Sequence, residues 1–185
     1  MRDLSLHILD LVQNSVKAGA SLVRVRIRDS AKEDVIAVEI SDDGCGMDEE
    51  LLLRVTSPFT TTRTTRKVGL GIPLFMANAQ GSGGAFSIDS KPGEGTCVRG
   101  TFRRSHIDRP PMGDIQGTML TLVLGTPKCP DYILRYETDD TSFTFDTREI
   151  RRALDGVPLD LPDVVSWMRD YLREGFDQIN GGAIL

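Results

Sequence analysis

The sequence predicts an α/β protein of one elaborated domain, or of one domain with an appendage. Residues 2–18 carry apolar side chains at helical spacing. Residues 21–41 then alternate between apolar and polar side chains on either side of a polar turn, which is the pattern of an antiparallel hairpin. Residues 84–102 repeat the hairpin pattern after a further helical segment. Helical and strand periods therefore alternate along a chain of 185 residues, which is long enough to bury a real core.

Composition and charge exclude several classes of protein. Hydrophobic residues make up 39% of the chain and charged residues 26%, as in ordinary globular proteins. The net charge is −5, so we expect neither a general nucleic-acid binder nor a membrane binder. The three cysteines form no C-x-x-C pair, which favours a reducing cytosol over a disulfide framework or zinc site. The N-terminus carries acids and no apolar run approaches the ~20 residues of a membrane span, so we expect a cytoplasmic protein.

The first predicted helix, residues 2–18, has two distinct sides. Its apolar side is made by Leu4, Ile8, Leu9, Leu11, Val12 and Val16. Its polar stripe is made by Asp3, His7, Asp10, Asn14 and Lys17. Gly19 follows as a plausible left-handed cap of the helix. Asp10 and Asn14 therefore lie one helical turn apart on the polar side.

A helix, an open loop and a second helix are predicted between the two hairpins. Residues 48–55 read as a short helix with acids in its first turn. Residues 56–69 are rich in Thr and basic residues and lack periodicity, so we expect an exposed, mobile loop. Residues 72–80 resume helical spacing, and Pro73 is tolerated in the first turn.

The chain changes character after Arg104. A connection broken by prolines is followed by predicted strands and helices at residues 117–125, 131–138, 142–147, 148–156 and 161–179, of which the first three are strands. Three short strands do not readily bury both faces alone. We therefore divide the chain into a core at residues 1–104 and a C-terminal extension at residues 105–185 that packs on the core.

A strand that ends on acids and glycines is the most informative segment. "VEISDDGCGMD", residues 38–48, alternates like a buried strand and then reaches Asp42, Asp43, Gly44 and Gly46. A carboxylate at a strand end can accept a hydrogen bond from the exocyclic amine of adenine, and glycines let the backbone approach a flat ring. Taken alone, D-x-G-x-G is also the wording of a tight turn, and both interpretations stay open for this segment.

A second glycine pair suits a phosphate group. "VGLGIPL", residues 68–74, places Gly69 and Gly71 at the start of a predicted helix, where backbone N–H groups point outward. The sequence contains no G-x-x-x-x-G-K-[ST], so a P-loop is excluded as the source of nucleotide binding.

The order of these segments resembles the GHKL superfamily, which includes DNA gyrase, heat-shock chaperones, histidine kinases and MutL-type repair proteins. An asparagine-bearing helix, D-x-G-x-G, a Thr-rich loop, G-x-G and a final "GEGT" follow one another over residues 4–102. The resemblance implies a two-layer α/β sandwich of the Bergerat type, with helices on one face of a mixed sheet and ATP held beneath a mobile lid. The C-terminal strands and helices would extend this fold.

The resemblance also implies a set of residues around Mg·ATP. They are Asp10, Asn14, Lys17, Asp42, Gly44, Gly46, Met47, Arg63, Gly69, Leu70, Gly71 and Thr96. Asn14 would bind Mg²⁺, and Asp42 would bind the adenine amino group. Gly44 and Gly46 would shape the base pocket, and Thr96 would stand near the nucleotide end of the last hairpin. The glycines of the G-x-G would admit the phosphates.

Some of these positions depart from the family pattern or have alternatives. The family ATPases place Glu where Asp10 stands, so the carboxylate that would act as base is shorter by one methylene. Arg63 would supply a cation to the nucleotide, and Arg66 and Lys67 are alternatives in the same loop. Asp43 has no implied role, and we expect a solvated or turn-forming carboxylate there.

The resemblance divides between two branches of the family. "SPFTTTR" and Lys17 are similar to histidine kinases, whereas "DDGCGM" and "NSVKAGA" are similar to mismatch-repair proteins. Histidine kinases carry an upstream helical hairpin with the phosphoacceptor His, and the family has an edge strand before the first helix. We expect neither here, because the helix begins almost at Met1, although a C-terminal strand could take the edge position.

The expected activity is that of a protein kinase that uses ATP and Mg²⁺ to phosphorylate an unidentified partner protein. An ATP-driven switch, a slow ATPase and a non-catalytic nucleotide sensor that regulates a partner remain as alternatives, and a homodimer is left open. His7 and His106 are expected to be partly exposed structural histidines rather than phosphoacceptors.

Overall fold

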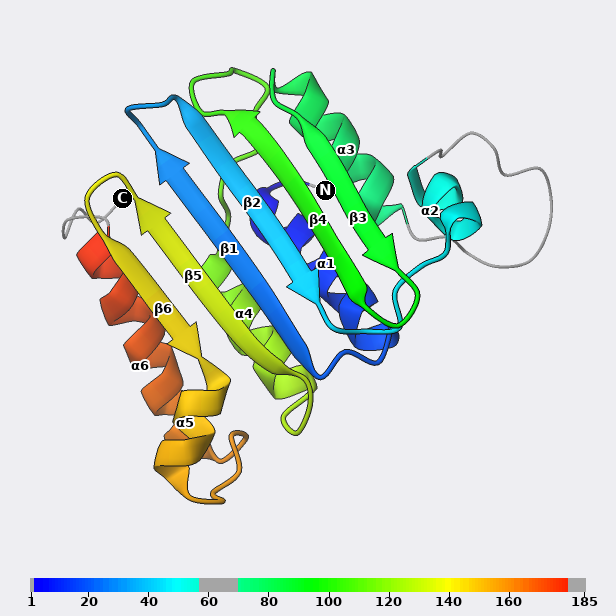
Figure 1. The fold of residues 1–185 in the computed structure, drawn as a ribbon. Helices are drawn as coiled ribbons and strands as arrows, with labels where there is room; N and C mark the ends of the chain where they lie inside the picture. The colour runs from blue at the N-terminus through cyan, green and yellow to red at the C-terminus, as the bar shows by residue number, and fades with distance from the viewer. Residues whose placement is uncertain (1, 57–69, 180–185) are drawn as a thin grey trace.

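The protein is built on one mixed sheet in the order β3-β4-β2-β1-β5-β6 (Figure 1). The computed structural model describes residues 2–56 and 70–179. The elements are α1 (Leu4–Lys17), β1 (Leu22–Ser30), β2 (Val35–Asp42), α2 (Glu49–Thr56), α3 (Gly71–Gly81), β3 (Phe86–Lys91), β4 (Gly95–Arg103), α4 (Ile115–Gly125), β5 (Asp131–Thr138), β6 (Ser142–Asp146), α5 (Thr147–Leu154) and α6 (Pro162–Ile179). Neighbouring strands are antiparallel except for β1 and β5, which are parallel.

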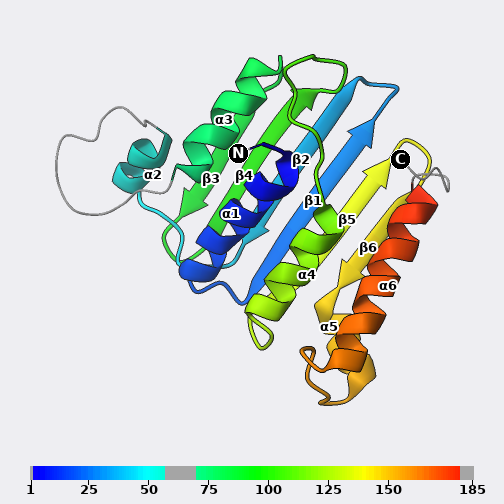
Figure 2. The same cartoon turned by 180° about the vertical axis from the view of Figure 1, so that it is seen from behind.

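Helices cover one face of the sheet. Figure 2 shows α1, α3, α4 and α6 lying across this face, whereas Figure 1 shows the opposite face of the strands without helices over it. The alternation along β1 explains the two layers, because Val23, Val25 and Ile27 are at most 1% exposed and the arginines between them are exposed. The predicted α/β sandwich with a mixed sheet is confirmed.

The position beside β1 is taken by β5. The two strands pair from Leu22↔Asp131 to Asp29↔Thr138 in parallel. A C-terminal strand therefore pairs with the side of β1 for which the sequence before residue 104 offers no strand, and β6 forms the outer edge of the sheet.

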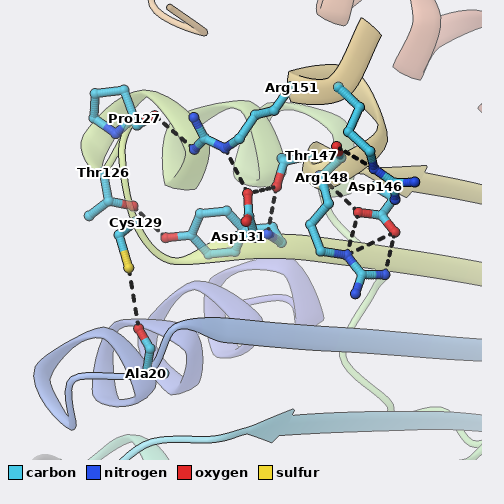
Figure 3. Close-up of polar contacts among 11 residues, drawn as sticks. Ala20, Thr126, Pro127, Cys129, Asp131, Asp146, Thr147, Arg148 and Arg151 are labelled. Carbon is cyan, nitrogen blue, oxygen red and sulfur yellow. Dashed lines mark hydrogen bonds and ion pairs between the residues drawn. The ribbon is translucent and has the colours of Figure 1, made fainter. Parts of the chain in front are cut away.

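Polar contacts fix the beginning of β5 to α5 (Figure 3). Thr147 Oγ1 donates to an Asp131 carboxylate oxygen at 2.8 Å and accepts from the Tyr132 N–H at 2.8 Å. Arg151 Nε donates to the same Asp131 oxygen at 2.8 Å, and its guanidinium also reaches the Pro127 carbonyl at 2.8 Å. Side-chain hydrogen bonds therefore connect α5 to the start of β5, in addition to the strand pairing of the sheet.

The strand predicted at residues 117–125 is wrong, because this segment belongs to α4. The Asp114 side chain caps the helix by accepting from the Gly117 N–H at 2.8 Å. Ile115, Met119 and Leu122 are buried at helical spacing. A short apolar run suits a buried strand and a buried helix equally well, so its periodicity alone did not distinguish them.

The other predicted elements are confirmed with small changes at their ends. Gly19 has φ +72°, as expected of a left-handed cap. The predicted loop at residues 56–69 lies outside the described residues, except for Thr56 at the end of α2. No helix in the described ranges is long and apolar enough to cross a membrane.

Candidate functional site

A cavity of about 370 Å³ opens between α1, α2 and the ends of β2 and β4. Its lining residues are mostly apolar, with a few polar groups at one end; they are Leu11, Asn14, Ser15, Ala18, Ile40, Asp42, Gly46, Met47, Leu51, Arg54, Val55, Ile72, Thr96 and Val98. A mostly apolar cavity of this size with a small number of polar groups is typical of a site for a small molecule or cofactor.

Asp42 ends β2 at the polar end of the cavity. One of its carboxylate oxygens, Oδ1, accepts from the Gly44 N–H at 2.9 Å. The other, Oδ2, accepts from the Ser15 hydroxyl at 2.6 Å. An ionised carboxylate offers about four acceptor positions, so Asp42 keeps acceptor capacity for a ligand.

Asp43 has a different task. Its carboxylate accepts from the Ser21 N–H at 2.7 Å, from the Leu22 N–H at 2.9 Å and from the Ser21 hydroxyl. Burial alone would raise the pKa of Asp43, but these hydrogen bonds outweigh it and lower the pKa. Asp43 therefore fastens the turn between α1 and β1, as expected of a turn-forming residue.

Gly44 and Gly46 allow the protein's own segments to meet. Gly46 has φ +66°, and a Cβ there would lie 1.9 Å from the Lys91 carbonyl oxygen. A Cβ on Gly44 would lie 2.9 Å from the Ala18 Cβ. The close approach that these glycines permit in this structure is to the chain itself, although Gly46 also lines the cavity.

Thr96 and Met47 are joined through Ser90. Thr96 stands directly opposite Asp42 in the sheet. Ser90 Oγ accepts from the Met47 N–H at 2.8 Å and lies 2.9 Å from Thr96 Oγ1. Ser90 thereby holds two of the predicted site residues against each other.

Asp10 and Gly71 come together beside the cavity. A Cβ built on Gly71 would lie 1.7 Å from Asp10 Oδ2, so the carboxylate packs against the first residue of α3. The N-terminus of a helix carries a partial positive charge that favours an anion. Asn14, one turn further along α1, lines the cavity. Asp10 and Asn14 on α1 and the start of α3 therefore lie together at this site.

The remaining predicted residues are dispersed. Lys17 is exposed in the last turn of α1 and does not line the described cavity. Leu70 is 66% exposed and precedes α3. Arg63 and Gly69 lie outside the described residues, as do the alternatives Arg66 and Lys67.

Three polar residues of the site were missed by sequence reasoning. Ser15 and Arg54 line the cavity, and Ser90 connects two of its walls. Ser15 directly follows Asn14, and Arg54 lies on a helix with no motif around it. Only their contacts across the fold identify them.

His7 is buried rather than partly exposed. Its ring packs 5.6 Å from that of Phe75, and Nε2 lies 2.7 Å from Asn78 Nδ2. Burial lowers the pKa of His7 to about 4. The side chain has a structural position between α1 and α3 and is not accessible as a phosphoacceptor. His106 is half-buried, as expected.

Comparisons with known proteins identify relatives of the first half of the chain. Residues 2–106 match the model of the family described as histidine kinase-, DNA gyrase B-, and HSP90-like ATPase. The non-motile and phage-resistance protein of Caulobacter vibrioides is 33% identical over 111 residues, which cover 55% of this chain and 13% of that protein. The sensor protein kinase FleS of Pseudomonas aeruginosa is 38% identical over 91 residues, which cover 49% of this chain and 22% of that protein.

A mismatch-repair protein is also similar over a shorter stretch. The DNA mismatch repair protein MutL of Chlorobium phaeobacteroides is 39% identical over 56 residues, which cover 30% of this chain and 8% of that protein. Each similarity thus concerns a small part of a much longer protein.

Proposed function

Because the chain belongs to the histidine kinase-, DNA gyrase B- and HSP90-like ATPase family, we propose that it binds Mg·ATP in the cavity beside α1 and phosphorylates a partner protein. The observation that carries this proposal is Asp42, a carboxylate with free acceptor capacity in a mostly apolar cavity of about 370 Å³. The apolar walls suit the faces of adenine, and Asp42 would accept from its exocyclic amine.

The phosphates would extend from the cavity along α1 toward the start of α3. The helix N-terminus beside Gly71 favours negative charge. No group of three His, Cys, Asp or Glu side chains within residues 2–56 and 70–179 is arranged to hold a metal ion. Mg²⁺ usually keeps several waters and binds through one or two protein ligands together with substrate phosphates, so Asn14 as the protein ligand fits it. Bound there, Mg²⁺ would neutralise charge on the phosphates.

Phosphoryl transfer would use Asp10 as the base. A hydroxyl or imidazole of the partner protein would attack the γ-phosphorus as the bond to the bridging oxygen of ADP breaks. The proton of the attacking group would pass to the Asp10 carboxylate. The similarity to FleS, a sensor protein kinase, supports transfer to a protein, and the partner would provide the phosphoacceptor.

An ATP-driven switch is the second candidate. It is favoured by the contact of the Asp10 carboxylate with the first residue of α3, because nucleotide bound at the start of α3 would change the position of this helix. Phosphate transfer from γ-labelled ATP to protein distinguishes the kinase from the switch, which would only release phosphate or bind nucleotide.

The adenine assignment is tested with two neighbouring carboxylates. Asp42→Asn is expected to weaken ATP binding by about 10- to 100-fold, because an amide would replace one acceptor oxygen facing the amine. Asp43→Asn should leave ATP affinity nearly unchanged and lower the melting temperature instead, because this side chain accepts from Ser21 and Leu22. Titration calorimetry with Mg·ATP checks both, and equal losses of affinity would remove Asp42 from the base site.

The contact between Asp10 and α3 is tested with two glycines of one helix. The Cβ of Gly71→Ala would displace the Asp10 carboxylate, and a shift of ~1 Å can cost ~10²-fold in rate. Gly81→Ala is the matched control, because a Cβ there meets nothing within 4 Å. We expect phosphoryl transfer to fall only in Gly71→Ala, although both changes favour the helical state of the chain. Equal rates in the two variants would show that the carboxylate position is unimportant.

A further inference from the structure

We propose that Ser15 is a specificity-determining residue that makes the polar end of the cavity select a purine with an amino group at C6 and reject one with a carbonyl there. This inference rests on the proposed function, since it assumes that the cavity receives the base of a nucleoside triphosphate. Ser15 is 4% exposed and donates its hydroxyl proton to Asp42 Oδ2 at 2.6 Å.

The direction of this hydrogen bond is fixed by the chemistry of the two groups. An ionised carboxylate only accepts, and a hydroxyl has one proton, so Ser15 Oγ keeps only acceptor capacity toward the cavity. The Gly44 N–H is likewise committed to Asp42 Oδ1 at 2.9 Å. Ser15 and Asp42 therefore present lone pairs to a ligand. The amino group of adenine would donate to them, whereas a carbonyl oxygen in the same place would be repelled.

Ser15 also fixes how the carboxylate is turned. With one oxygen held from α1 and the other from the loop after β2, Asp42 is held from two elements. A carboxylate that could rotate freely would also accept from the N–H at N1 of hypoxanthine. Adenine has no proton at N1, so this contact would reduce the preference for ATP over ITP. Thr96 also lines the cavity, but its hydroxyl contacts Ser90 Oγ at 2.9 Å rather than Asp42, and Ser90 donates its one proton to the Gly95 carbonyl at 3.0 Å. Thr96 therefore adds an acceptor, whereas Ser15 is the side chain that fixes the orientation of the Asp42 carboxylate.

The chain contains a matched control for this contact. Ser21 donates to Asp43 just as Ser15 donates to Asp42, but neither Ser21 nor Asp43 lines the cavity. Ser21→Ala thus removes a serine–aspartate hydrogen bond at the residue that follows Asp42, outside the cavity lining. It reports what losing such a bond does to folding alone.

The experiment measures binding of Mg·ATP and Mg·ITP to the wild-type chain, Ser15→Ala and Ser21→Ala by calorimetry, with a melting curve for each protein. ITP carries a carbonyl at C6 and a proton at N1, and is otherwise the same as ATP. We expect the preference for ATP over ITP to fall by about tenfold in Ser15→Ala, because a hydrogen bond to a charged group is lost, and to stay unchanged in Ser21→Ala. A lower melting temperature with an unchanged ratio in Ser15→Ala would show that Ser15 is only structural and would overturn the inference.

A measurement on the wild-type chain tests the inference without any variant. Purine riboside triphosphate has hydrogen at C6, so it neither donates nor repels there. If Ser15 and Asp42 present only acceptors to C6 of the base, affinity should decrease in the order ATP, purine riboside triphosphate, ITP. ITP binding as tightly as purine riboside triphosphate would contradict the inference while leaving the proposed function intact. Absence of binding for all three nucleotides would overturn the proposed function and this inference together.

Discussion

Asp10→Asn is expected to reduce phosphoryl transfer by about 10²- to 10⁴-fold, which is the usual contribution of a positioned general base. Affinity for Mg·ATP should change little, because the carboxylate acts on the attacking group rather than on the nucleotide. Single-turnover transfer to the partner protein, measured beside calorimetric affinity, separates the two effects. The position of Asp10 supports its role as the base, because its carboxylate lies against the first residue of α3, where the phosphates would end.

The short side chain of Asp10 should also affect how fast the isolated chain hydrolyses ATP. Asp reaches about 1.5 Å less than Glu, one carbon–carbon bond. Water would therefore be activated poorly, whereas a group delivered by a partner protein could approach the carboxylate more closely. We expect weak ATP hydrolysis by the isolated chain and transfer only in the presence of the partner.

Asn14→Ala is the companion variant that tests the proposed Mg²⁺ ligand, measured by nucleotide affinity with and without Mg²⁺. Asn14 lies one turn from Asp10 and lines the cavity, so its loss should weaken the Mg²⁺-dependent part of nucleotide binding itself.

Full activity in Asp10→Asn with normal binding would remove the base from the mechanism and favour transfer that needs no carboxylate at this position.

A chain ended after Arg104 is expected to be unfolded or aggregated. It would lose β5, whose hydrogen bonds cover the edge of β1 from Leu22 to Asp29. It would also lose many buried side chains, among them Met119, Val123, Leu134 and Phe145, each at most 1% exposed. Burying four such side chains contributes about 6–12 kcal/mol, the order of the whole ~5–15 kcal/mol stability of a domain.

The connection after residue 104 also supports α1 directly. The Leu4 N–H donates to the Pro111 carbonyl at 2.9 Å, and the Ser5 N–H donates to the Met112 carbonyl at 2.9 Å. Without these partners two N–H groups in the first turn of the helix that carries Asp10 and Asn14 would lose their acceptors, and only the Asp3 side chain, which accepts from the Leu6 N–H, would still cap this turn. Circular dichroism and gel filtration of residues 1–104 beside the full chain test this expectation. A soluble fragment that binds ATP would show that the extension is an independent appendage.

The sequence by itself determined the elements whose evidence is local. The spacing of apolar residues predicted α1 and β1, and the placement of Asp10 and Asn14 one turn apart follows from the helical period. Asp42 at the end of β2 followed from the alternation that stops there. The order of these motifs was enough to predict the fold and the family. Such features depend on neighbours within about one helical turn or one strand, so they can be predicted from the local sequence.

The tertiary structure decided what depends on partners distant in the chain. Residues 117–125 belong to a helix that packs between α1 and α6 and against β5, and β5 joined β1 across a long separation. Ser15 met Asp42 27 residues away, and His7 was buried against α3 71 residues away. A residue's local pattern is the same whether or not such a contact forms, since burial and the choice of hydrogen-bond partner are settled only when the elements pack together.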